Sequence, residues 1–136
     1  MLNYLYAVNR LHMSRPLPTY GPEVPPELQD KARTHVPKVD VQPDKVRKGE
    51  SALVKIDLSA HPDRQDHAIT LIELYYEEEG RNLNPVHVAH IVLEPEVVER
   101  VVELRLRPRA SGWLHVVAYC NQHGLWHAVK RIEVEG

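Results

Sequence analysis

The chain is short of cysteine, since Cys120 is the only one among its 136 residues. One thiol cannot form an intramolecular disulfide, so the fold must be held by its hydrophobic core and does not require an oxidising compartment. A chain of this length is sufficient for one domain with an ordinary core.

An excess of charge of either sign is also lacking. Lysine and arginine number 17 against 19 aspartates and glutamates, which gives a formal net charge of −2 at pH 7. A protein that follows a nucleic acid needs a strongly basic surface, and this composition does not supply one. We therefore expect no nucleic-acid partner.

Long apolar runs are absent as well, because no stretch approaches the roughly 18 apolar residues of a membrane helix. The N-terminal sequence MLNYLYAVNRLHM is apolar but has no early basic residue. Asn3, Asn9 and Arg10 interrupt it before any small-residue cleavage site, so it does not resemble a signal peptide. We expect a soluble, cytoplasmic protein that does not contact a membrane.

The first 30 residues differ in character from the rest. Residues 2–12 predict a short helix from a loose clustering of apolar side chains. Residues 15–28 contain five of the eleven prolines, and because proline fixes φ and lacks an amide donor, this segment is expected to be extended. The sequence thus predicts an N-terminal arm over residues 1–30, ahead of a domain over residues 31–136.

From residue 38 onward, apolar residues recur with a period of two, and helical periodicity is absent. Turn signals, among them Pro43-Asp44 and Ser111-Gly112, separate the alternating segments. Seven segments are strand candidates: KVDVQ, SALVKIDLS, AITLIELYY, HVAHIVL, VVELRLR, GWLHVVAYC and HAVKRIEV. The predicted fold class is all-β, an immunoglobulin-like seven-stranded antiparallel β-sandwich with an extended proline-rich N-terminal arm.

Histidine is plentiful, with nine in the chain, and one of them lies close to the lone thiol. Alternation along residues 112–120 places Leu114, Val116, Ala118 and Cys120 on one apolar face, so the sulfur is expected to point inward at the end of a strand. His123 follows in the next turn. A buried cysteine is commonly a small hydrophobic residue, so the pair alone leaves both a core role and a metal site open.

Two further histidine segments lie upstream. HPDRQDH places His61 and His67 in the loop between two predicted strands, and THVP places His35 at the end of the extended segment, before the first predicted strand. Taken one at a time, each of these histidines is equally compatible with a solvated loop.

The three segments together resemble the superoxide reductase family, also called neelaredoxin, whose catalytic domain recurs in desulfoferrodoxin. The family pattern is His-Val-Pro, then His-Pro-x4-His before a strand, then Cys-Asn-x-His-Gly-x-Trp. All three occur here in that order, over about residues 31–135, and the four-cysteine iron domain of desulfoferrodoxins is absent. The chain therefore resembles the one-iron class.

The resemblance implies one iron ion per chain, Fe²⁺ or Fe³⁺, with a defined ligand set. The equatorial ligands would be His35, His61, His67 and His123, and the axial ligand Cys120. Five ligands also argue against structural zinc, which closes at four. The implied function is one-electron reduction of superoxide to hydrogen peroxide in antioxidant defence. A rubredoxin-like or other small electron donor and a homo-oligomer, commonly a tetramer, are implied as partners.

The sequence departs from the family in front of the first histidine. The family usually has Glu-Lys before His-Val-Pro, with the glutamate at the sixth iron position in the oxidised form and the lysine attracting superoxide. Here Arg33 and Thr34 stand there. Lys31 and Arg33 are the nearby cations predicted to steer the anionic substrate instead.

Two other functions compete with the enzyme. One is a cupredoxin-like electron-transfer protein, which also uses a late Cys-to-His turn but usually adds a methionine after it, whereas both methionines here lie far upstream, at positions 1 and 13. The other is a non-catalytic immunoglobulin-like binding module. The metal content of the purified protein distinguishes all three.

Overall fold

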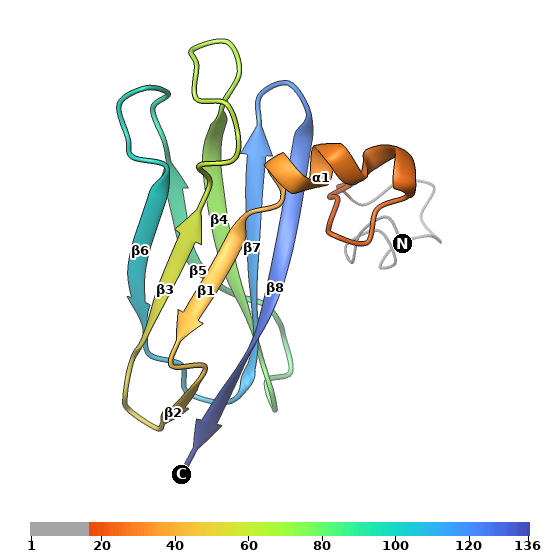
Figure 1. Cartoon of the computed structure of the whole chain (residues 1–136). Helices are drawn as coiled ribbons and strands as arrows, with labels where there is room; N and C mark the ends of the chain where they lie inside the picture. The colour runs from red at the N-terminus through yellow and green to blue at the C-terminus, as the bar shows by residue number, and fades with distance from the viewer. Residues whose placement is uncertain (1–16) are drawn as a thin grey trace.

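The computed structural model describes residues 17–136, which form two facing β-sheets with one short helix at one end (Figure 1). The helix predicted at residues 2–12 lies outside the described residues. The strands are β1 (Lys38–Gln42), β2 (Lys45–Arg47), β3 (Ala52–Asp57), β4 (Ile69–Glu78), β5 (Val86–Val92), β6 (Val101–Leu106), β7 (Gly112–Cys120) and β8 (Gly124–Glu135).

The two sheets have the orders β1-β3-β6 and β2-β8-β7-β4-β5. Every strand pair is antiparallel except β2 with β8, which is parallel and joins Val46 to Val134 in register. The predicted β-sandwich is confirmed, and all seven predicted strands are present. The short β2 is an additional strand that the sequence pattern did not indicate.

The core lies between the sheets and is built by the alternation that the sequence predicts. Leu114, Val116, Ala118 and Cys120 of β7 all belong to the main apolar cluster, and none of the four has any exposed surface. On the opposing sheet, Val54 and Ile56 of β3 are equally buried. Because Cys120 ends this row, its thiol lies where the core meets one end of the sandwich.

A helical segment that the sequence analysis did not predict precedes β1. A 3₁₀ turn (Pro26–Leu28) leads into α1 (Gln29–His35). Pro26 suits the start, since a first-turn position needs no amide donor. The helix ends at His35 because Pro37 disfavours the helical conformation of the residue before it, and Val36 is extended with ψ 123°. The arm and domain boundary predicted between residues 30 and 31 falls inside this helix and stays a prediction.

Four segments far apart in the sequence meet at one end of the sandwich. Figure 1 shows α1 beside the β7–β8 turn, with the β3–β4 and β5–β6 loops at the same end. In the part of the chain that the structure describes, no helix has the length and apolar character needed to cross a membrane.

Candidate metal centre

The five predicted ligands all lie at this end of the sandwich. His35 is the last residue of α1, His61 and His67 belong to the β3–β4 loop, Cys120 ends β7, and His123 lies in the turn before β8. The turn closes with Gly124 at a φ of +80°, a left-handed conformation that glycine adopts without steric cost. This sharp return brings His123 back over the sulfur.

The four imidazoles form a closed ring. The ring-centroid distances are 4.4 Å for His35–His61, 4.8 Å for His61–His67, 5.1 Å for His67–His123 and 5.0 Å for His123–His35. The diagonal from His35 to His67 is longer, at 6.2 Å, and neighbouring rings are inclined by 72° to 89°. The histidines thus surround a common centre, with their planes set steeply against one another.

The buried thiol lies against this ring. The Sγ atom of Cys120 is 3.7 Å from Nδ1 of His123. Ligand atoms of His35, His61, His67 and Cys120 all lie within 4.8 Å of one another. The structure therefore brings together every sequence-predicted ligand, three of them (His35, His61 and Cys120) with almost no exposed surface.

Backbone carbonyls fix which nitrogen of two rings faces the centre. Nδ1 of His35 donates to the carbonyl oxygen of Lys31 at 2.8 Å, and Nδ1 of His61 donates to that of Pro62 at 2.7 Å. A carbonyl can only accept, so both protons are on Nδ1 and both Nε2 atoms present lone pairs. Such outer hydrogen bonds orient histidines that bind metals.

The donor atoms fit a bound cation. The Nε2 atoms of His35 and His61 face each other at 3.2 Å, and two facing lone pairs repel unless a positive charge lies between them. Nε2 of His67 is buried and has no hydrogen-bond partner among the described residues. Metal–nitrogen bonds of about 2.1 Å at right angles put neighbouring nitrogens about 3.0 Å apart, close to the spacing here.

Burial also favours the neutral, metal-binding form of His35, His61 and His123. Desolvation is the main cause that lowers the pKa of His35 to about 4. Desolvation likewise lowers the pKa of His61 and that of His123, and neighbouring positive charges act in the same direction. The site is therefore suited to a metal rather than to stored protons.

These shifts make the stability of the metal-free protein depend on pH. The pKa of His35 is about 4 in the folded state and about 6.5 in the unfolded chain, so the unfolded state binds more protons between these values. The free energy of unfolding should therefore fall as the pH drops from 6.5 to 4, with His35 contributing about 1.4 kcal/mol per pH unit. Urea titrations of the chelator-treated protein across this range measure it.

The matched control is His35→Gln, which removes one titrating group. Its free energy of unfolding should depend less steeply on pH over the same range. Equal slopes for the two proteins would show that His35 is not the group that takes up the proton.

Neighbouring residues tie the ligand segments together. Asn121 joins the turn to Ala68, the residue after His67. Its side-chain Oδ1 accepts from the backbone amide of Ala68, and its backbone amide donates to the Ala68 carbonyl, both at 3.2 Å. Nε2 of Gln122 donates to the carbonyl of Asp66 at 2.6 Å. The turn that carries Cys120 and His123 is thereby held against the loop that carries His67.

Trp126 supports two ligands at once. Its ring centroid lies 5.1 Å from that of His35, and its Nε1 donates to the carbonyl of His123 at 3.0 Å. The side chain is 2% exposed and belongs to a small apolar cluster with Val24 and Ala32. Trp126 therefore packs over two of the proposed ligands and is also a core residue.

The two predicted steering cations occupy different surroundings. Nζ of Lys31 is 3.3 Å from Nε2 of His123, at the margin of the histidine ring. Arg33 instead forms an exposed ion pair with Asp30, one turn away on α1. Thr34, at the position of the family's lysine, places its hydroxyl 2.8 Å from Nδ1 of His35 and donates to the carbonyl that this ring binds.

The remaining described histidines lie outside the centre. His87 and His90 of β5 are half-exposed and contact Glu73. His115 contacts Glu77, and His127 is buried with Nδ1 2.7 Å from the hydroxyl of Thr19. His12 lies outside the described residues.

Four imidazoles and one thiol around a common centre at the end of a β-sandwich define a mononuclear metal-binding protein. The family profile described as Desulfoferrodoxin matches residues 27–129. The chain belongs to the desulfoferrodoxin family.

Three similar proteins share the name superoxide reductase. The chain is similar to the superoxide reductase of Pyrococcus horikoshii, with 31% identity over 112 residues that cover 76% of this chain and 90% of that protein. The one from Pyrococcus furiosus is 29% identical over 115 residues, 71% of this chain and 86% of that protein. A solved variant of the superoxide reductase (neelaredoxin) from Ignicoccus hospitalis superposes with a TM-score of 0.81 at 41% identity, covering 86% of this chain and 94% of that one.

Proposed function

We propose that this chain is a superoxide reductase, which reduces superoxide to hydrogen peroxide at a mononuclear iron. The observation that carries the proposal is the closed ring of four imidazoles against one buried thiol. The family and the named relatives support it. The proposed ligands are His35, His61, His67, His123 and Cys120.

The reaction takes one electron and two protons per superoxide, O₂•⁻ + e⁻ + 2H⁺ → H₂O₂. Iron(II), when bound, supplies the electron and a Lewis-acid position for the substrate. The chain's residues hold the five donor atoms in place, and Cys120 supplies the only anionic ligand of the set. These five donors would hold the iron, and water would supply the protons.

The thiolate is the soft member of the donor set and favours iron over harder ions. The Sγ atom of Cys120 lies 3.7 Å from Nδ1 of His123, so the thiol and this imidazole would hold the same ion. The burial of Cys120 keeps bulk water away from the sulfur, so the charge on the sulfur is screened little.

Lys31 is the better candidate for attracting the anionic substrate. Its Nζ is 3.3 Å from Nε2 of His123, so its positive charge lies beside one of the residues that would hold the iron. A cation there would raise the local concentration of an anion. The ion pair with Asp30 makes Arg33 less effective.

We therefore expect Lys31→Gln to lower the second-order rate constant for superoxide several-fold at low ionic strength. The difference should shrink at physiological salt, where the Debye length is about 8 Å. Stopped-flow mixing of the reduced protein with superoxide across a salt series measures both effects.

Arg33→Gln is the matched control on the same helix, and its rate should stay closer to that of the parent protein because Asp30 already offsets its charge. If Lys31→Gln reacts as fast as the parent at low salt, the metal ion alone draws in the substrate, and Lys31 has no steering role.

The proposal extends to the remaining partners on the strength of the family. A small electron donor of the rubredoxin type would supply the electron for each turnover. The chain acts in the cytoplasm as a homo-oligomer, for which sedimentation of the iron-loaded protein is the direct measurement.

Metal analysis of the purified protein separates this function from its competitors. A superoxide reductase should contain about one iron per chain, in line with five convergent donors. Copper would instead favour the cupredoxin-like electron carrier. A protein that binds no metal after anaerobic incubation with iron(II) would contradict the proposal and favour a non-catalytic binding module.

A further inference from the structure

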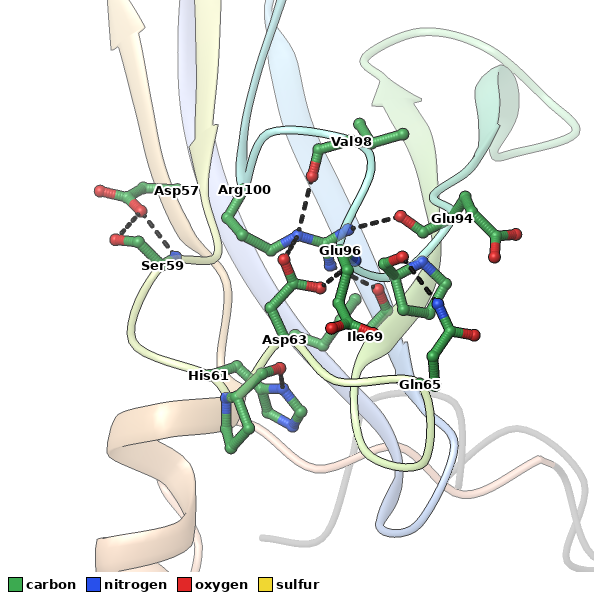
Figure 2. A network of polar contacts seen from close by, with 12 residues as sticks. Asp57, Ser59, His61, Asp63, Gln65, Ile69, Glu94, Glu96, Val98 and Arg100 are labelled. Carbon is green, nitrogen blue, oxygen red and sulfur yellow. Dashed lines mark hydrogen bonds and ion pairs between the residues drawn. The ribbon is translucent and has the colours of Figure 1, made fainter.

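The loop between β3 and β4 carries His61 and His67, so its conformation sets the position of two proposed ligands. Within the loop, the amide of His61 donates to the carbonyl of Leu58, and Arg64 and His67 exchange two backbone bonds at 3.1 Å. The loop lies against the β5–β6 loop, residues 93–100, and Figure 2 shows the polar contacts between them. These contacts come mainly from Arg100 and Asp63.

Arg100 joins the two ends of the histidine loop. Its carbonyl accepts from the Leu58 amide at 2.7 Å, three residues before His61. Its Nη1 donates to the carbonyl of Ile69 at 2.8 Å, two residues after His67. The side chain is only 10% exposed, so this contact is shielded from solvent. One residue thus fixes the distance between the points where the loop leaves β3 and enters β4.

The same guanidinium holds its own loop in place. Its Nε donates to the carbonyl of Val98 at 3.1 Å, and its Nη2 donates to that of Glu94 at 3.4 Å. Figure 2 shows Arg100 between the two loops, with these carbonyls on one side and Asp63 on the other. The planar fork of arginine allows several such bonds in fixed directions, which a lysine cannot match.

Asp63 ties down the middle of the histidine loop. Its Oδ2 lies 3.5 Å from Nε of Arg100, and its Oδ1 accepts from the Glu96 amide at 2.8 Å. Nε2 of Gln65 adds a bond to the carbonyl of Pro95 at 3.1 Å. The loop is therefore attached at its start, middle and end.

The β5–β6 loop adopts an unusual conformation at Glu96, whose amide binds Asp63. Glu96 has a φ of +69°, and it is the one non-glycine residue with positive φ in the described chain, 17–136. Such a conformation persists where the surroundings determine it, and strained backbone gathers near functional sites. Here it directs an amide toward the carboxylate of Asp63.

We propose that Arg100 and Asp63 are positioning residues for the metal centre, which hold His61 and His67 at the spacing that the ion requires. This inference rests on the proposed function only in taking these two histidines as ligands. Neither side chain is a ligand in the proposed set. We call the contacts of Arg100 and Asp63 with the β3–β4 loop the clamp. Loss of the clamp leaves the sandwich intact but lets this loop move, so metal binding must then order the loop.

The test uses Arg100→Gln and Asp63→Ala, with Arg107→Gln as the matched control. Arg107 is exposed and lies just past the opposite end of β6, away from the loop. Cobalt(II) affinity is measured by chelator competition, and hydrogen exchange follows the amides of residues 59–68 in the metal-free protein. We expect these two variants to bind cobalt about 10–100-fold more weakly, the range found when groups that orient metal ligands are removed. Arg107→Gln should match the parent.

Hydrogen exchange separates positioning from general destabilisation. In the clamp variants, exchange should quicken in residues 59–68 and stay unchanged in β7 and β8. Asp63→Asn keeps an acceptor for the Glu96 amide and should restore part of the affinity, whereas Arg100→Lys should restore little. Should Arg100→Gln fail to fold, the two Asp63 variants test the same clamp from its more exposed side.

Parent-like cobalt affinity in the Asp63→Ala variant would overturn the inference. So would equal acceleration of exchange in β7 and β8, because the residues would then stabilise the whole fold. Failure of the proposed function has a different signature: the parent protein itself would bind no metal, while the exchange data would still report on the clamp.

Discussion

Replacing Cys120 with serine is expected to abolish the sulfur-to-iron charge-transfer absorption of the oxidised protein. It should also lower the rate of superoxide reduction at least about 100-fold, since loss of a ligand exceeds the 10–100-fold effect of losing an outer partner. Serine is close to cysteine in shape, so the buried pocket at the end of β7 remains filled. Its hydroxyl stays protonated near neutral pH, and so it does not replace the soft thiolate.

The visible spectrum of the oxidised protein measures this result, and far-ultraviolet circular dichroism checks that the sandwich is intact. Cys120→Ala serves as the control, because it removes the sulfur without adding a hydroxyl. Both variants should lose the colour. A charge-transfer band that persists in either variant would mean that Cys120 is not an iron ligand.

Removing one imidazole from the ring should have the second largest effect. His61→Ala is expected to lower iron affinity by at least about 100-fold, because four donors remain and a buried cavity replaces the ring. The carbonyl of Pro62 also loses its hydrogen bond from Nδ1. Chelator competition and the iron content of the purified variant measure the change.

His90→Ala is the matched control, since this half-exposed histidine lies on β5 and contacts Glu73 rather than the ring. It should keep the parent's iron content. Equal iron content in His61→Ala and the parent would remove His61 from the ligand set, and a loss in His90→Ala would indicate a general effect of histidine removal.

The sequence predicts the fold best where only one face of a strand is buried. In β1 and β3, buried apolar residues alternate with more exposed ones, which indicates both the strand and the face that packs inward. The pattern was insufficient for β2, whose three residues contribute one buried side chain, Val46. It was also insufficient for α1, where seven residues bury only Ala32 and His35, too few to show a helical period.

The candidate ligands could be predicted because their motifs have a recognisable spacing in the sequence. The residues that hold them in place could not, because they act through contacts between distant loops. Arg100 is 37 residues from Asp63, and no local pattern connects them. Trp126 was visible as part of a motif, but its hydrogen bond to the His123 carbonyl and its packing on His35 depend on how α1 meets the turn. The same holds for Lys31, whose approach to His123 requires the helix that the sequence pattern did not indicate.

The central claim is that this chain reduces superoxide rather than dismutating it, and the peroxide yield tests that claim most directly. The iron-loaded protein is reduced, freed of excess reductant and mixed anaerobically with less than one equivalent of superoxide. We expect one hydrogen peroxide for each superoxide consumed, equivalent loss of iron(II) and no release of oxygen. Half as much peroxide, accompanied by oxygen and with the iron left reduced, would contradict it.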